Sequence, residues 1–348
     1  MEKVYLACIV ARDGVSYPSM ADILRITGDP SHDAHHVRSA ASVIRSGGIV
    51  ALPTETVYGL AADALNPSAV AKIYEAKGRP STNPLIVHVA SLDGAKDLAA
   101  TWPPTAQKLA EAFWPGPLTI IVPKKAIVPD AATAGLPCVA LRVPSHPVMH
   151  AVIEEAGTPL AAPSANRSQA VSPTRAAHVL KSLGSAVDVI LDAGTTQHGL
   201  ESTVVDCTVV PPRVLRPGPV TIAELERVVG RVKADDAVIG DELSRASPGM
   251  SPKHYAPQAK VRVVPMAKLA EAITSSDAPV AVLLIGGAVL GTSATKVQMP
   301  AEPVAYGAVL YGEFHKMDDA GMKTIIVEEP PSAPGWEAVR DRLRRASA

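Results

Sequence analysis

Short runs of apolar residues, each closed by a loop rich in proline, serine or glycine, recur along the first two thirds of the sequence. Runs of this length are typical of buried strands, and stretches with helical periodicity separate several of them. The pattern predicts an α/β protein with a large twisted mixed sheet and helices between its strands. The predicted strands cover residues 48–54, 84–90, 117–124, 138–144, 158–164, 188–194, 202–208 and 213–218.

Capping residues mark the predicted helix boundaries. A helical pattern from residue 33 stops at a double glycine at residues 47–48. Asn66 followed by a proline predicts an N-cap for a helix that runs through Lys77 and ends at a glycine. Residues 221–230 begin with a threonine and a glutamate at the spacing of a capping box, which predicts a short helix there.

The pattern changes twice along the chain, which predicts a division into parts. Residues 1–32 have no strong period and are interpreted as an N-terminal extension or an edge element, and residues 33–230 form the first domain. Residues 231–258 are polar and contain SPGMSPKHYAP, so they are interpreted as an extended linker. Residues 259–348 alternate strand and helix, which predicts a small Rossmann-like, doubly wound α/β domain.

Composition excludes several classes of protein. The 348 residues carry 33 Lys and Arg against 34 Asp and Glu, and this net charge of −1 excludes a whole-chain electrostatic grip on nucleic acid. Three cysteines lie far apart, which indicates neither a disulfide framework nor a zinc site and fits a reducing cytoplasm. The longest apolar stretch, residues 279–291, is too short for a membrane span, so no membrane contact is expected.

The densest group of polar side chains lies at residues 77–88. Lys77 ends a predicted helix and Arg79 follows in an extended segment, where alternate residues share a side, so the two cations can meet one anion. Asn83 and His88 complete the group. Each residue alone has an ordinary interpretation, such as a helix-dipole partner for Lys77 or a satisfied core position for His88. Together they favour a binding site.

Arg142 stands in the middle of a strand that otherwise suits burial. A buried arginine needs a partner, and both a structural salt bridge and a bound anion are open. Cys138, on the same strand face, fits a small packed residue better than a nucleophile. The loop 162–174 offers hydroxyls and an amide that suit phosphate, ribose or amino-acid recognition, or only a turn. Neither a P-loop nor a G-x-G-x-x-G motif is present.

Taken in order, these strings resemble the threonylcarbamoyl-AMP synthase family in its long form, which has a YrdC-like catalytic domain and a smaller C-terminal domain. The resemblance is close over residues 33–258 and architectural over 259–348. The matching strings are LPTETVYGL, AKGRPSTNPLIVHV, WPGPLT, ALRVPSHP, APSAN, ESTVVD, LRPG and SPGMSPKHYAP.

The resemblance implies a nucleotidyl transfer. L-Threonine and bicarbonate or CO2 form N-carboxythreonine, whose carboxylate attacks the α-phosphate of ATP and releases pyrophosphate. The product, L-threonylcarbamoyladenylate, serves the modification of the tRNA adenosine next to the anticodon. Such chemistry needs positioning and charge neutralisation rather than a protein nucleophile, in agreement with the lysine, arginine and hydroxyl residues singled out above.

The resemblance also implies roles for individual residues, with Lys77 and Arg79 in catalysis. Tyr255 and its neighbour His254 resemble a linker segment that folds over the site as a lid. The threonine pocket would comprise Thr56, His88, Arg142, Ala162 (through its backbone) and Ser202. The ATP site would comprise Arg79, Asn83, Cys138, Ser164, Asn166, Ser172, Arg216, His254 and Tyr255.

The nucleotide implies Mg²⁺, held by phosphates and water because no D-x-D pair is present and no metal-ligating residues are expected. The expected partner is a tRNA threonylcarbamoyl transferase, with or without the tRNA itself, and the enzyme is expected to be a monomer.

Two other functions are compatible with the same cationic residues or with a YrdC-like domain. A double-stranded RNA or tRNA-binding module would lose affinity steeply with salt. A carbamoyl transferase with a YrdC-like domain would be expected to carry cysteine pairs, which this sequence lacks.

Overall fold

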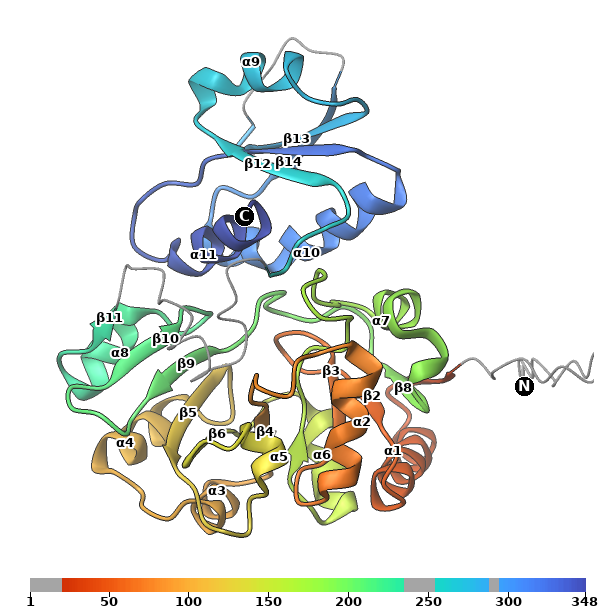
Figure 1. Ribbon diagram of the computed structural model, residues 1–348, viewed down its shortest axis with the longest axis vertical. Coiled ribbons are helices and arrows are strands. Elements are labelled where there is room, and N and C mark those ends of the chain that lie inside the picture. The colour runs from red at the N-terminus through yellow and green to blue at the C-terminus, as the bar shows by residue number, and fades with distance from the viewer. Residues whose placement is uncertain (1–20, 235–253, 288–293) are drawn as a thin grey trace, which may run out of the picture.

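A computed structural model of the protein describes residues 21–234, 254–287 and 294–348. Two α/β domains lie one above the other along the long axis of the molecule, with helices of the smaller domain facing the larger one (Figure 1). Cys8 and most of the predicted linker, residues 235–253, lie outside the described residues.

The larger domain contains one mixed sheet, as predicted, in the order β1-β8-β2-β3-β7-β4-β6-β5-β9-β10-β11. Each of the eight predicted runs contains a strand of this sheet. Parallel and antiparallel neighbours alternate irregularly, for instance β4 parallel to β6 and antiparallel to β7. The strands are β1 (Asp22–Arg25), β2 (Val50–Leu52), β3 (Gly59–Asp63), β4 (Ile86–His88), β5 (Leu118–Pro123), β6 (Cys138–Arg142), β7 (Leu160–Ala161), β8 (Val189–Asp192), β9 (Thr203–Asp206), β10 (Arg213–Arg216) and β11 (Lys233–Ala234).

Helices cover this sheet and pack two apolar clusters against it. The helices are α1 (Pro30–Arg45), α2 (Pro67–Lys77), α3 (Leu92–Leu98), α4 (Pro104–Phe113), α5 (Asp130–Thr133), α6 (Pro147–Ala156), α7 (Ala176–Leu183) and α8 (Ile222–Val229). In the part of the chain that the structure describes, no helix is long and apolar enough to cross a bilayer.

Local sequence explains the position of α2, which brings Lys77 to the site. Asn66 accepts hydrogen bonds from two amides of the first turn, and the proline after it fits the first helical position. Gly78 ends the helix with φ 58°, a left-handed conformation that glycine adopts without strain. Both ends of this helix are therefore where the sequence predicts them. The capping box of Thr221 and Glu224 is likewise confirmed.

Some boundaries differ from the prediction. Asp29 caps α1, which begins at Pro30 rather than at residue 33, and β1 pairs parallel with β8 as an edge strand of the sheet, in line with the edge element expected before residue 33. At the other end β11 pairs with β10, so the sheet extends past residue 230. Strand β3 was not expected because its sequence, GLAAD, has small residues with little β-propensity.

The smaller domain has a fully parallel sheet in the order β12-β15-β13-β14, with helices on both faces. This confirms the predicted doubly wound α/β architecture, with β14 in addition. Helix α9 covers one face, and α10 and α11 lie between the other face and the larger domain (Figure 1). The elements are β12 (Lys260–Val264), α9 (Leu269–Thr274), β13 (Val280–Ile285), β14 (Thr295–Met299), α10 (Pro303–Asp319), β15 (Thr324–Glu328) and α11 (Glu337–Ala346).

The two domains share an apolar core. The buried cluster under α10 and α11 contains Tyr306, Leu310 and Phe314 together with Val57 and Leu200 of the larger domain. Backbones approach closely at this interface. A Cβ atom added to Gly199 would lie 2.4 Å from the carbonyl oxygen of Ala308 on α10. The backbone of the larger domain at Gly199 and the backbone of α10 are therefore in direct contact.

We expect Gly199→Ala to destabilise the protein more than a matched glycine change. Gly199 has φ +67°, and Gly157 has the same φ with nothing within 4 Å of the position that a Cβ atom would take. Alanine at Gly157 should cost only the left-handed conformation, about 1–2 kcal/mol. Alanine at Gly199 adds a backbone clash, for a total of about 3 kcal/mol. Urea unfolding of the two variants measures the difference, and equal losses would contradict the close interface.

Candidate active site

A pocket with about 470 Å³ of empty space, part of it open to solvent, lies where loops of the larger domain meet the end of the linker. Ten of the predicted site residues line it, drawn from seven separate stretches of sequence. They are Thr56, Arg79, His88, Arg142, Ala162, Ser164, Ser202, Arg216, His254 and Tyr255. The structure also places Val57, Ile86, Pro163 and Glu201 in the lining, none of which was singled out from the sequence.

Lys77 lies behind the lining rather than in it. Its ammonium donates hydrogen bonds to the carbonyl oxygens of Ser164 and Asn166, each at 2.5 Å. Burial, reinforced by the charge of Arg79, lowers the pKa of Lys77 well below its ordinary value. Lys77 thus fixes the loop that presents Ser164 to the pocket, and both Lys77 and Arg79 lie close enough to His254 to reinforce burial in lowering the pKa of that histidine.

Arg79 is held as a cation at the pocket wall. Its guanidinium donates to the carbonyl oxygens of Asn83, at 3.3 Å, and Pro84, at 3.0 Å. Burial lowers the pKa of Arg79 to about 10, which still leaves it charged at neutral pH. Since both bonds use carbonyl acceptors and no carboxylate, its positive charge is left available to a ligand.

Arg142 has an acidic partner that the sequence did not reveal. One nitrogen, Nη2, lies 2.7 Å from Oε1 of Glu55, while Nη1 donates to Thr56 and Nε to the carbonyl of Gly116. Burial alone would raise the pKa of Glu55, but the charge and hydrogen bond of Arg142 outweigh it and lower that pKa to about 2. The salt-bridge interpretation of Arg142 is therefore confirmed, and the guanidinium still lines the pocket.

Ser202 and Arg216 form a second polar wall. Arg216 donates from Nε to the carbonyl of Ser202 at 3.0 Å and from Nη2 to its hydroxyl at 3.1 Å. The Ser202 hydroxyl also bonds Thr119, 2.7 Å away. These bonds fix both the hydroxyl and the guanidinium in direction, which prepares them to receive a ligand without reorganisation.

His88 is a neutral polar group on the pocket wall. Burial, followed by the nearby charge of Arg142, lowers the pKa of His88 to about 3. Its Nδ1 atom is buried and has no hydrogen-bond partner among the described residues. A buried polar atom without a hydrogen bond destabilises the protein, so a ligand that hydrogen-bonds to Nδ1 of His88 would remove this cost.

The end of the linker lines the pocket through His254 and Tyr255. Tyr255 is 1% exposed and has φ 60°, a left-handed conformation that is uncommon for a residue with a side chain. Its ring packs edge-on to His254, stacks on Tyr311 at 5.8 Å, and lies 5.0 Å from the guanidinium carbon of Arg342. Contacts with the smaller domain thus hold this strained turn in place.

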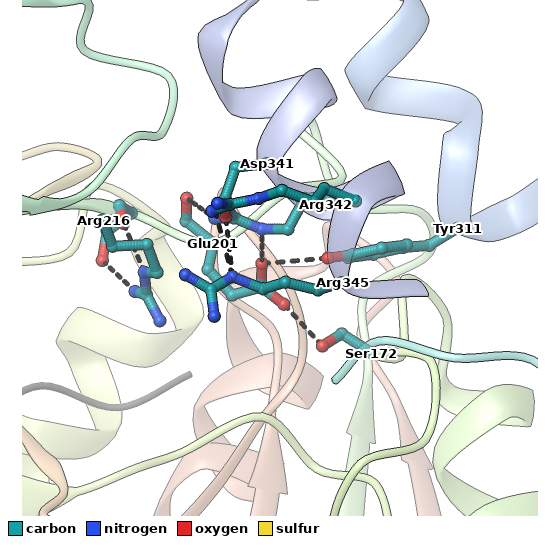
Figure 2. A network of polar contacts seen from close by, with 9 residues as sticks. Ser172, Glu201, Arg216, Tyr311, Asp341, Arg342 and Arg345 are labelled. Carbon is teal, nitrogen blue, oxygen red and sulfur yellow. Dashed lines mark hydrogen bonds and ion pairs between the residues drawn. The ribbon is translucent and has the colours of Figure 1, made fainter. Parts of the chain in front are cut away.

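Glu201 is the functional-site residue that the sequence analysis missed. Its carboxylate accepts hydrogen bonds from Ser172 at 2.5 Å, Tyr311 at 3.1 Å and Arg342 at 2.8 Å (Figure 2). Burial would raise the pKa of Glu201, but Arg342 outweighs it and the pKa is lowered. The string ESTVVD held a signal, because an acidic residue beside a predicted buried strand needs a cation. Nothing in the sequence indicates which cation that is.

Four other predicted residues are near the pocket without lining it. Ser172 is bound to Glu201. Asn166 donates to the carbonyls of Arg167 and Ala170 and so closes its own loop. Asn83 keeps a buried Oδ1 with no hydrogen-bond partner among the described residues. Cys138 packs in an apolar cluster that continues the Ile86 face of the sheet, where burial raises the pKa of its thiol.

The residues present do not fit a metal centre held by the protein. Among the described residues no group of three histidine, cysteine or acidic side chains could hold a metal ion. The two acidic residues at the pocket, Glu55 and Glu201, are each bound to an arginine.

This arrangement defines a class of protein: an α/β enzyme whose pocket holds cations, hydroxyls and a neutral histidine ready to position anionic substrates for group transfer. Comparison with family models supports and narrows that class. Residues 42–218 match the model described as "Telomere recombination", and residues 220–348 match "Threonylcarbamoyl-AMP synthase, C-terminal domain". The chain belongs to the threonylcarbamoyl-AMP synthase family, in its long, two-domain form.

Individual relatives agree over nearly the whole chain. The threonylcarbamoyl-AMP synthase of Pyrococcus abyssi is 42% identical over 320 residues, which cover 89% of this chain and 94% of the relative. That of Bacillus subtilis is 40% identical and covers 92% of this chain and 96% of its own. The solved structure of P. abyssi Sua5 with L-threonine has a TM-score of 0.86 and 38% identity, and covers 94% of this chain and 98% of its own.

We expect Glu55→Gln to lower the free energy of unfolding by about 3 kcal/mol at pH 7, because Arg142 keeps its buried charge without a counter-charge. The folded-state pKa of Glu55 is lowered to about 2, so its contribution is fully present above about pH 4.5 and is lost as the pH falls toward 2. The gap between wild type and variant should shrink in that window. Urea unfolding from pH 7 down to pH 3 measures it.

Glu154→Gln is the matched control, since Glu154 is 62% exposed and pairs with His150 on the surface. Its loss should stay below about 1 kcal/mol and change little with pH. If the two variants lose the same stability, Glu55 does not compensate Arg142.

Proposed function

We propose that this protein joins L-threonine, bicarbonate or CO2, and ATP into L-threonylcarbamoyladenylate and pyrophosphate, with the pocket residues in the roles that follow. Membership of the family supports the reaction, and so does the solved complex of a relative with L-threonine. The observation that carries the assignment of roles is that, within the lining, Arg142 lies beside His88 on the neighbouring strand, and Arg79 is close enough to Arg216 to feel its charge.

Threonine binds at the Arg142 end. Nε and Nη1 of Arg142 each donate one N–H group, to Gly116 and Thr56, and Nη2 faces Glu55 in the ion pair, so further N–H groups of the guanidinium are left for the carboxylate of the substrate. Neutral His88 accepts a hydrogen bond from the substrate at Nδ1. Thr56, Ser202 and the backbone of Ala162 supply the remaining polar contacts of this end.

ATP binds at the Arg79 end. Arg79 and Arg216 neutralise phosphate charge, and Ser164, on the loop that Lys77 holds, donates its hydroxyl. Asn83 and His254 offer buried atoms that have no hydrogen-bond partner among the described residues. Mg²⁺ arrives as part of the MgATP substrate.

The reaction then forms an N–C bond and an O–P bond, and it breaks an N–H bond, whose proton goes to solvent, and the P–O bond to pyrophosphate. The threonine nitrogen attacks CO2, loses a proton and becomes a carbamate. A carbamate oxygen attacks the α-phosphorus of ATP, and the bond to the bridging oxygen of pyrophosphate breaks. The protein lowers the barrier by holding the carbamate in line with the leaving group and by countering the charge on the phosphates.

The end of the linker acts as the cover of the site. His254 and Tyr255 are the one consecutive His–Tyr pair of the sequence. A solved variant of P. abyssi Sua5, with 39% identity to this chain and a TM-score of 0.85, has a consecutive histidine and tyrosine replaced by alanine. The product is a mixed anhydride that water hydrolyses, so a cover that limits water serves the chemistry. The enzyme that uses this product is a transferase that acylates a tRNA adenosine.

Mass spectrometry on the purified protein with ATP, Mg²⁺, L-threonine and bicarbonate tests this function. Threonylcarbamoyl-AMP and pyrophosphate should appear, and both should vanish when threonine or bicarbonate is left out. A folded protein that makes neither, and whose affinity for tRNA falls steeply as salt rises, would instead be an RNA-binding module.

We expect Arg79→Ala to reduce adenylate formation at least about 100-fold, because a phosphate contact in a buried site is worth several kcal/mol. The melting temperature of the variant should stay close to that of the wild type, so that the loss of turnover is not explained by unfolding. Arg45→Ala is the control, since Arg45 is 47% exposed on α1 and pairs with Glu155. Full turnover by the Arg79 variant would remove Arg79 from the phosphate site.

A further inference from the structure

An ion pair is buried between the two domains, next to the pocket. Nε of Arg342, on α11 of the smaller domain, lies 2.8 Å from Oε2 of Glu201 on the larger domain (Figure 2). The Arg342 side chain has no exposed surface and that of Glu201 is 8% exposed. Moving two charges out of water is costly, so a pair in this position contributes little net stability and calls for another explanation.

The negative charge of Glu201 lies at a position where it would oppose the binding of an anionic substrate. Glu201 lines the pocket, and the residue after it, Ser202, is bound by Arg216 through both its carbonyl and its hydroxyl. An uncompensated carboxylate here would repel a triphosphate and would compete with it for Arg216. Among the described residues of the larger domain, Glu201 has one hydrogen-bond partner, the hydroxyl of Ser172, and its nearby cation there is Arg216 itself.

The smaller domain supplies the compensation. Arg342 brings the positive charge, and Tyr311 on α10 donates a further hydrogen bond to the same oxygen. Arg342 is itself held in direction, because its Nη1 donates to Asp341 at 2.8 Å. Arg344 and Arg345 in turn bind Asp341, so this carboxylate is fully engaged as well.

We propose that Arg342 is a positioning residue for ATP: it neutralises Glu201, keeps Ser172 and Glu201 in place, and thereby directs the positive charge of Arg216 to phosphate. The proposal rests on the function argued above, and it gives the smaller domain a part in ATP binding that acts through Glu201. Arg342 also lies under the Tyr255 ring, so the same guanidinium supports the cover of the site.

Calorimetric binding of ATP and of L-threonine to full-length variants tests the proposal. Arg342→Met removes the charge and keeps most of the volume, and it should weaken ATP binding at least about 10-fold while threonine binding changes less than about 3-fold. The double variant Arg342→Met/Glu201→Gln should recover ATP binding to within about 3-fold of wild type, because the carboxylate that needed compensation is gone. Arg340→Met is the control, on the same helix but exposed and bound to Ser332.

A role in domain attachment alone predicts the opposite pattern. The double variant would then bind ATP no better than Arg342→Met, and both substrates would weaken together; either result overturns the proposal. If Arg342→Met does not fold, Tyr311→Phe removes one hydroxyl from Glu201 and should weaken ATP binding about 3-fold with threonine binding unchanged. Unaltered ATP binding in that variant would count against the proposal.

Turnover measured on the same samples separates this inference from the proposed function. A wild type that binds ATP and makes no adenylate would contradict the synthase activity and leave the Arg342 comparison intact. A wild type that makes the adenylate, with no rescue by Glu201→Gln, would contradict the role of Arg342 alone.

Discussion

A charge that is buried away from water requires a counter-charge, and this constraint organises the centre of the molecule. Glu201 sits beside the pocket, and its compensating cation, Arg342, comes from the other domain, 141 residues further along the chain. A second buried carboxylate, Glu55, is compensated within the larger domain by Arg142. The first pair joins the two domains, and the second orients a side chain of the pocket.

Apolar side chains and close backbone contacts also join the two domains beside the Glu201–Arg342 ion pair. Leu200, next to Glu201, belongs to the buried cluster of the smaller domain, and Gly199 admits the backbone of α10 at a distance that no side chain would allow. Tyr255 joins this cluster from the linker. Gly199, Leu200 and Glu201 all contact the smaller domain, and Ser202 follows them directly in the chain. The position of the pocket wall at Ser202 therefore depends on how the smaller domain packs against the larger one.

Much of the fold could be predicted from local sequence, since the relevant interactions are local. Asn66 and Gly78 bound α2 through their own backbone preferences, and alternation along residues 138–144 placed Arg142 on the opposite face from the apolar core. Strand β3 escaped prediction because glycine and alanine carry little strand signal, and it is held by its neighbours on both sides.

The site was predictable to a different degree. Family strings brought together ten residues that do line one pocket. What they did not supply were the partners: that Lys77 binds two carbonyls of a loop nearly ninety residues away, and that Arg142 and Glu201 are both members of ion pairs. Such pairings depend on tertiary placement, and one sequence contains no record of it.

With Arg342 in the proposed role, ATP binding depends on both domains, and this is the central claim. Amide hydrogen exchange of the full-length protein, with and without a non-hydrolysable ATP analogue, tests it most directly. If the claim holds, the analogue slows exchange in α11 and around Tyr311 as well as in the loops of the larger domain. Protection confined to residues of the larger domain would contradict it.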